Sequence, residues 1–279
     1  MKITIAASLL TVACMMNAQI WPDAKPPIAE KQNHIRDIHG EKVSDPYYWM
    51  IDYFKKGKDS TKVVNYLNAE NAYLETMMAD TKQLRANLYE EIKARIKKKD
   101  ESVPVFKNGY YYYSRTETGK QYFKYCRKKG NLSAPEEILL DVDQMAEGKA
   151  YYTATGFSIS PDNSKMIFGV DDVSRRQYSL FLKDLNTGKI TDLGIKNTEG
   201  NAVWAADNNT IFYTAKNDVT LLSEKIKRHT LGTNSSKDAV VYEEKDNTNY
   251  IGVDKSKNEK YILIYSSATT SSEVRYLPA

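Results

Sequence analysis

The sequence predicts a mainly β fold: a partial β-propeller of about three and a half blades, preceded by an N-terminal helical segment. Three observations predict it. Apolar residues change from helical to alternating spacing near residue 103, tyrosine outnumbers phenylalanine 21 to 7, and one strand–turn pattern recurs three times. Large rings suit the pleated, half-buried surface of a sheet, and a four-strand repeat of about 40–50 residues is typical of propeller blades.

Composition excludes several classes of protein. The chain has 279 residues, of which 41% are hydrophobic and 27% charged, with a formal net charge of +4. This is the composition of a folded globular protein, not of a disordered or coiled-coil chain. The small net charge gives no reason to expect a nucleic-acid partner, which would need a clustered basic face.

Residues 1–18 are predicted to be a secretory signal peptide. Lys2 is followed by an apolar stretch, Ile3–Met16, and then by the small residue Ala18. The stretch of 14 is shorter than the ~20 residues that a membrane-spanning helix needs, and no later segment is long and apolar enough. We therefore expect an exported protein, periplasmic or secreted, cleaved near Ala18.

Two alternatives remain open for this terminus. The first is a lipoprotein acylated at Cys14, although Leu10 lies one position too far upstream for a good lipid-attachment motif; the second is a structural helix. Cleavage near Ala18 would leave Cys126 as the remaining cysteine, which we expect in a strand. Without an internal disulfide, core packing must stabilise the exported chain.

Residues 19–102 are predicted to be an extended and then helical segment. Prolines favour an extended Trp21–Asp45, because proline fixes φ and disfavours helix in the residue before it. A first helix should begin at Asp59 or Ser60, because apolar residues then recur at helical spacing. Those residues are Val63, Val64, Leu67, Leu74, Met77 and Met78.

A second helix is expected to open at Asp80, with Gln83 as its capping-box partner. The residues Leu84, Leu88, Ile92 and Ile96 form an i, i+4 stripe on one face of this helix. Three lysines, Lys97–Lys99, should end it, where cations suit the negative helix terminus. We interpret that lysine run as a solvated helix end.

Residues 103–279 are predicted to be an incomplete β-propeller. Tyr110–Tyr113 should pair with Tyr122–Cys126 across the turn Glu117–Lys120. Further on, three strand–turn units start at residues 157, 203 and 251, so they are 46 and 48 residues apart. Each has an Asp-containing turn after its first strand: Asp162, Asp207 and Asp254.

The predicted blades are residues 103–141, 156–193, 201–245 and 249–279. Asn186–Gly188 supplies the tight turn before the last strand of the second blade, since glycine readily adopts positive φ. An antiparallel sandwich is the alternative fold, but it would not repeat the same strand order three times.

Hydrolytic chemistry needs an activated nucleophile or a metal-bound water. The three histidines, His34, His39 and His229, lack the spacing of a helical zinc pair, and the first two are expected in loops. The sequence contains no G-x-S-x-G, Cys-x-x-Cys, Walker or G-x-G-x-x-G motif. We therefore assign no catalytic, cofactor-binding or metal-ligating residue and expect no cofactor.

Two motifs stand in the N-terminal part: His39-Gly40 followed by Asp45–Asp52, and the helix Tyr66–Tyr73. Three further stretches are Ile96–Pro104, Gly119–Arg127 and Glu136–Gly148. The first motif resembles the N-terminal motif of the prolyl oligopeptidase family, apart from Tyr48, where arginine is frequent, and the second resembles the family's Tyr-Leu-x-Ala-Glu-Asn-x-Tyr helix. The three stretches are most similar to the family's oligopeptidase B (protease II) branch.

This resemblance implies a serine peptidase in which a seven-bladed propeller caps an α/β-hydrolase domain and gates access to it. Such enzymes cut short peptides after Lys or Arg, using a Ser–Asp–His triad. The family carries the triad on the C-terminal side of the propeller, so no catalytic position can be assigned in this chain. The N-terminal helices are implied to pack beside the hydrolase domain.

Length agrees with this interpretation. Seven blades need well over 300 residues, but Val103–Ala279 holds 177, and the last unit stops after its third strand, Glu273–Leu277. We expect the chain to be a fragment of a longer protein, inactive alone. The alternative is a stand-alone exported β-propeller that binds a ligand without catalysis.

Overall fold

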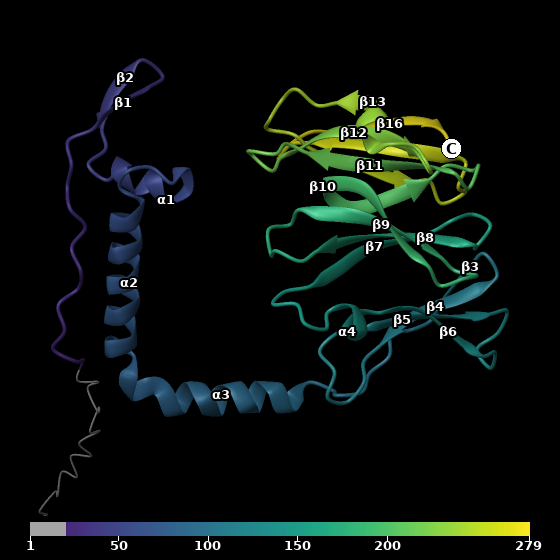
Figure 1. The fold of residues 1–279 in the computed structure, drawn as a ribbon, viewed down its shortest axis with the longest axis horizontal. Coiled ribbons are helices and arrows are strands. Elements are labelled where there is room, and N and C mark those ends of the chain that lie inside the picture. The colour runs from purple at the N-terminus through teal and green to yellow at the C-terminus, as the bar shows by residue number, and fades with distance from the viewer. Residues whose placement is uncertain (1–20) are drawn as a thin grey trace, which may run out of the picture. The chain divides into compact units, whose positions relative to one another are not determined.

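The computed structural model describes residues 21–279; the predicted signal peptide and Cys14 lie outside the described residues. The chain divides into two units, the first ending at Ile96 and the second beginning at Lys97 (Figure 1). The residue limits given above for the domains and the individual blades remain predictions.

The first unit begins with a small hairpin that the proline-rich sequence did not predict. Strand β1 (Ile35–Ile38) pairs antiparallel with β2 (Glu41–Ser44). Between them, His39 and Gly40 both adopt positive φ, and the amide of Gly40 donates to the carboxylate of Asp37 over 3.0 Å. This short turn explains how a hairpin forms within a segment expected to be extended.

A short helical corner follows, with η1 (Tyr48–Ile51) and α1 (Asp52–Lys55). Trp49 is buried there, and its indole nitrogen donates to the carbonyl of Glu30 over 2.9 Å. The ammonium of Lys62 lies 4.9 Å from the centre of the same ring. These contacts fix the family-like Asp-Pro-Tyr-x-Trp motif against the helix that follows.

Both predicted helices are present; the first begins at Ser60 as predicted, and the second begins later than predicted. The first is α2 (Ser60–Met77), and its N-cap residue Asp59 makes no side-chain capping bond. The second, α3 (Lys82–Arg95), follows the short η2 (Ala79–Thr81). The Asp80–Gln83 capping box was wrong, because Gln83 instead donates to Asn87, and Lys97–Lys99 lie beyond the helix end.

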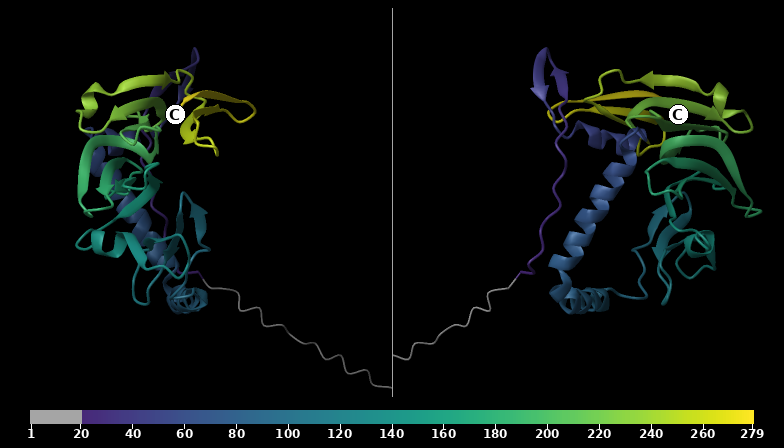
Figure 2. Two further views of the ribbon diagram at one scale, coloured as in Figure 1. Left: turned by 90° about the vertical axis from the view of Figure 1, so that its right-hand side faces the viewer. Right: turned by 60° about the vertical axis from the view of Figure 1, so that its left-hand side comes forward.

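The second unit is built from antiparallel sheets that follow one another along the chain (Figures 1 and 2). The first sheet contains β3 (Val105–Lys107), β4 (Tyr110–Arg115), β5 (Lys124–Lys129) and β6 (Glu136–Asp141). The predicted pairing of the tyrosine run with Cys126 is confirmed, since Tyr113 lies opposite Cys126. A single helical turn, α4 (Val142–Met145), leads onward.

The next two strand groups are joined into one sheet. Their strands are β7 (Thr153–Ile159), β8 (Lys165–Asp171), β9 (Tyr178–Asp184), β10 (Ile190–Trp204), β11 (Thr210–Lys216), β12 (Ser223–Thr230) and β13 (Ala239–Glu243). The junction is β10, which pairs with β9 in its first half and with β11 in its second. Gly194 and Gly200 have positive φ where its register shifts. One strand thus ends one blade and starts the next.

The last sheet has three strands, β14 (Tyr250–Lys255), β15 (Tyr261–Ser267) and β16 (Ser272–Pro278). Here β16 is the outer edge. Strand positions therefore follow the alternating patterns expected from the sequence. The antiparallel sheets of the second unit confirm the mainly β fold.

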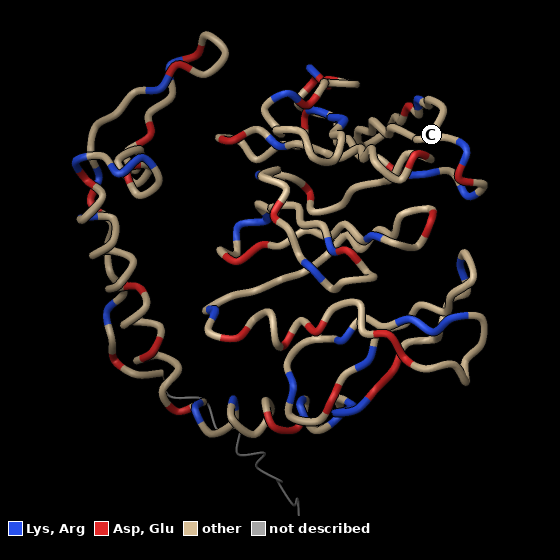
Figure 3. The backbone as a smooth tube through the Cα atoms, turned by 45° about the vertical axis from the view of Figure 1, so that its right-hand side comes forward, with Lys and Arg blue, Asp and Glu red and all other residues tan. Residues whose placement is uncertain are grey.

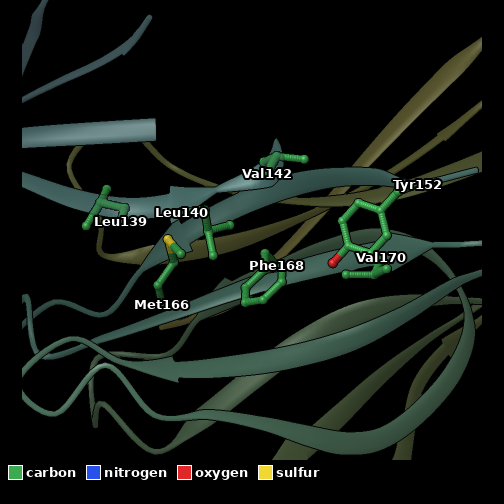
Figure 4. Packing of buried hydrophobic residues seen from close by; sticks show 7 residues of the cluster. All are labelled: Leu139, Leu140, Val142, Tyr152, Met166, Phe168 and Val170. Atoms are coloured by element: carbon green, nitrogen blue, oxygen red, sulfur yellow. The ribbon is translucent and has the colours of Figure 1, made fainter. Parts of the chain in front are cut away.

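Alternate residues of a middle strand belong to two different cores. In β8, Met166 and Phe168 pack with Leu140 of the first sheet (Figure 4). Ile167 between them packs with Trp204 of the third group. Side chains along a strand point to opposite faces, so a strand apolar at every position is buried on both. Stacked sheets of this kind are the blade packing of a propeller.

Candidate functional site

The innermost strands of the four groups enclose an open cavity of about 1230 Å³. Its walls include β3, β7, the second half of β10 and β14, the first strand of each group, and on one side it extends to residues of β4, β5 and β6. In a propeller, first strands surround the central channel. The cavity is therefore the described part of such a channel.

Neighbouring walls of the channel are fastened to each other near Trp204. This residue is buried, and its indole nitrogen donates to the carbonyl of Ser158 on β7 over 3.0 Å. Close by, Gly156 and Gly169 approach Gly200 so tightly that a Cβ at either position would lie under 2.5 Å from its backbone. Glycine is required at both places because two backbones meet there.

Each group carries an equivalent turn; those of the first, second and last groups line one end of the channel, and that of the third contacts its neighbour through Asn208 and Asp162. The residue after the first strand's turn has positive φ in every case: Asn108, Asn163, Asn208 and Glu259, at 47°, 60°, 57° and 58°. Asparagine tolerates this left-handed region better than most residues, which explains its choice three times. The turn is the structural repeat.

In three of these turns, the side chain of the residue just before the left-handed one stabilises the turn. Asp162 accepts from the amide of Ser164, Asp207 from that of Asn209, and Asn258 from that of Lys260. The Asp-containing turns predicted at Asp162 and Asp207 are confirmed, but Asp254 was the wrong residue, because it lies within β14. Aligning Asp162-Asn163 and Asp207-Asn208 with Asn258-Glu259 would have found the turn of the last group.

Charges of both signs surround this end. The ammonium of Lys107 lies 3.1 Å from a carboxylate oxygen of Glu259. Partial burial opposes ionisation of Glu259, but its bonds to Lys107 and Asn108 keep its pKa below the ordinary value. Burial also lowers the pKa of nearby Lys255. Along the second unit, basic and acidic residues are interspersed (Figure 3).

The three histidines lie in separate places. His34 precedes β1 and stacks on Tyr48 with ring centres 3.9 Å apart, while His39 lies in the hairpin turn. His229 is buried in β12, where Nδ1 lies 2.7 Å from a carboxylate oxygen of Asp238. The other oxygen of Asp238 accepts from the hydroxyl of Tyr213 over 2.8 Å.

The His229–Asp238–Tyr213 network joins β11 and β12 to the connection before β13, and buried polar groups of this kind need such partners. Cys126 is a buried strand residue, as expected, and burial raises the pKa of its thiol to about 12. Within residues 21–279, no cluster of three or more metal-ligating side chains occurs. None of the helices in that range is long and apolar enough to cross a membrane.

Comparison with known proteins places these features in a family. Residues 26–279 match the family model described as prolyl oligopeptidase, N-terminal beta-propeller domain. Dipeptidyl aminopeptidase BI from Pseudoxanthomonas mexicana is 38% identical over all of this chain, which covers 40% of that protein. Protease 2 from Moraxella lacunata is 32% identical over 91% of the chain, which covers 37% of it.

The structure of oligopeptidase B from Leishmania major superposes with a TM-score of 0.80 at 30% identity. It covers 92% of this chain, whereas the chain covers 38% of it. The chain thus spans about two fifths of the length of the relatives it matches. Because the family match runs through both the helical unit and the stacked sheets, the chain belongs to the prolyl oligopeptidase family and carries its N-terminal β-propeller domain.

Proposed function

We propose that this chain is the N-terminal, propeller-containing part of an exported serine-type oligopeptidase, which cleaves short peptides after Lys or Arg. The observation that carries the proposal is the family match over residues 26–279, together with relatives more than twice as long. The catalytic α/β-hydrolase domain would follow this chain in the whole protein. Its propeller would gate substrate access to that domain.

The features of the channel support a gating role. A cavity of about 1230 Å³ can hold a peptide segment, but not a folded protein. The apolar stripe of α3, Leu84, Leu88, Ile92 and Ile96, is exposed in this chain. A helix with an exposed apolar face needs a partner surface. The proposed hydrolase domain would supply it.

A second activity is favoured by the relative with 38% identity, whose name is dipeptidyl aminopeptidase. Such an enzyme would release dipeptides from a free amino terminus. The two specificities differ in one requirement that can be measured. An endopeptidase accepts a substrate with a blocked amino terminus, and a dipeptidyl aminopeptidase does not.

The coding sequence beyond codon 279 gives the first test. A G-x-S-x-G motif followed by Asp and then His is expected there. The full-length protein should then hydrolyse an amino-blocked Arg-amide substrate, and a serine-directed inhibitor should stop it. Hydrolysis of only the free-amino-terminus substrate would replace the oligopeptidase assignment by the aminopeptidase one. A stop codon at 280 would favour the stand-alone binding protein.

Export has its own test. Mass spectrometry of the mature protein from its natural host should find an amino terminus near Gln19. A lipid on Cys14 would show the lipoprotein alternative, and an intact Met1 would contradict export through a cleaved signal.

A further inference from the structure

Glu259 connects the first sheet of the second unit to the last, although two strand groups lie between them in sequence. Its carboxylate accepts from the side-chain amide of Asn108 at 3.3 and 3.4 Å and pairs with the ammonium of Lys107 at 3.1 Å. Asn108 and Glu259 are 151 residues apart. Both line the channel cavity, at the end lined by the turns.

The other turn residues make only neighbour-to-neighbour contacts. The side-chain amide of Asn163 donates to the carbonyl of Asn108 over 3.1 Å. The side chain of Asn208 accepts from the amide of Asp162 over 2.9 Å. These bonds tie the first group to the second and the second to the third. The contact of Glu259 is different because it crosses the channel.

The residue type at this position also differs from its equivalents. Asn108, Asn163 and Asn208 suit their left-handed backbone, whereas glutamate is not favoured there. Strained residues that persist often serve a function. The side chain of Glu259 reaches the ammonium of Lys107 on the opposite wall. An asparagine at position 259 would be too short to do so.

We propose that Lys107, Asn108 and Glu259 form a strap across this end of the propeller channel and limit the size of molecule that can pass. The consequence for peptides rests on the proposed function. With that function, the strap would keep longer peptides from reaching the catalytic domain through the propeller channel.

The strap contributes little to global stability. The side chain of Lys107 is 64% exposed and that of Glu259 is 30% exposed, so water and salt screen their attraction. Neutralising one partner should therefore widen the channel end without unfolding the sheets. Access and stability can thus be separated experimentally.

The test uses the full-length protein with a reporter cysteine, Ser158→Cys, in the cavity wall two residues before a turn. Two uncharged reagents are compared: N-ethylmaleimide, and a maleimide carrying a neutral polyethylene glycol chain. Peptide mapping by mass spectrometry measures modification at position 158 alone. The quantity compared is the ratio of the large-reagent rate to the small-reagent rate.

Glu259→Gln and Lys107→Gln are each expected to raise this ratio at least threefold. The charge exchange Lys107→Glu with Glu259→Lys should return it toward the wild-type value. The matched control is Lys257→Gln, an exposed cation of the same turn that also lines the cavity, and it should leave the ratio unchanged. An equal N-ethylmaleimide rate in all variants shows that the fold is intact.

An unchanged ratio in both single variants would overturn the strap. A ratio in the charge-exchange variant as high as in the single variants would also overturn it. The width of the channel end would then depend on the type of side chain and not on the ion pair. Labelling needs no peptidase activity. Absence of peptidase activity in the full-length wild type would therefore contradict the proposed function and leave the strap standing.

Discussion

The ionisation of Glu136 is tied to the fold by its hydrogen bonds. The guanidinium of Arg115 donates to both its oxygens, at 2.8 and 3.1 Å, and the hydroxyl of Tyr113 donates at 2.5 Å. The bonds from Arg115 outweigh partial burial and, with that from Tyr113, lower the pKa of Glu136 to about 2. Charge-assisted, two-pronged bonds of this kind are among the stronger ones in proteins.

This geometry predicts a pH-dependent contribution to stability. A carboxyl group with a lowered pKa stabilises the fold above its unfolded pKa, near 4.5, and the contribution is lost as pH falls toward 2. Glu136→Gln should lower the local free energy of unfolding of β4–β6 by about 1–3 kcal/mol at pH 7. The difference should shrink between pH 5 and pH 2.

Amide hydrogen exchange of these strands, measured across that pH range, checks the prediction. Glu147→Gln serves as control, because Glu147 is exposed. A wild-type-to-variant difference that stays constant down to pH 2 would count against the assignment.

Cys126 is predicted to be chemically inert. The thiolate is the reactive form, and burial raises the pKa of this thiol to about 12, so little of it is ionised at pH 8. Iodoacetamide should modify Cys126 in the native protein at least ~100-fold more slowly than in guanidinium. Rapid native alkylation at Cys126, located by mass spectrometry, would show a more open first sheet.

At the scale of elements, the close approach of β7, β8 and β10 depends on glycine. A Cβ on Gly169 would lie 2.4 Å from the backbone of Gly200, which cannot move aside as a flexible side chain would. Gly169→Ala should therefore lower the melting temperature by several degrees, corresponding to about 2–4 kcal/mol from overpacking.

Gly252→Ala is the matched control. Gly252 also lies in a strand, β14, and a Cβ there has no heavy atom within 4 Å. This variant should melt at the wild-type temperature or slightly above. Equal losses in the two variants would mean that strand backbone freedom, and not the contact with Gly200, sets the effect.

Elements were predictable from the sequence where periodicity alone decides them. The stripe beginning at Leu84 and the tyrosine run at Tyr110 identify a helix and a strand. The capping box at Asp80 failed because a 3₁₀ turn intervenes, and the β1–β2 hairpin was hidden by nearby prolines. Local turn geometry can override a capping motif or the effect of nearby prolines, and the short motifs themselves do not show where it does so.

The channel end was missed for a different reason. Lys107 and Glu259 are joined only by tertiary structure, and no local pattern pairs residues so far apart in sequence. The repeat in the sequence predicted the blades but located the turn of the last group at Asp254, four residues before Asn258, which forms it. Among the four turns, Glu259 is the one left-handed residue that is not an asparagine.

At the scale of the molecule, the last sheet leaves one face and one edge uncovered. One face of β15 packs Ile262 and Ile264 against the preceding group, but Tyr261 and Tyr265 on the other face are exposed. On the edge strand β16, Tyr276 is 71% exposed. Unpaired strand edges and exposed apolar faces promote self-association, and in a closed ring the next blade covers both.

The isolated 279-residue chain should therefore aggregate or fold only in part, and show no Lys- or Arg-amide hydrolysis. Size-exclusion chromatography and thermal melting test the first expectation. Tyr265→Lys with Tyr276→Lys should increase the monomeric fraction, because charges on the uncovered face and edge oppose association. The control, Tyr53→Lys with Tyr89→Lys, changes exposed tyrosines of the helical unit and should have less effect. A wild-type chain that is monomeric and melts cooperatively would contradict this expectation. The sheets of this chain would then fold stably without further blades.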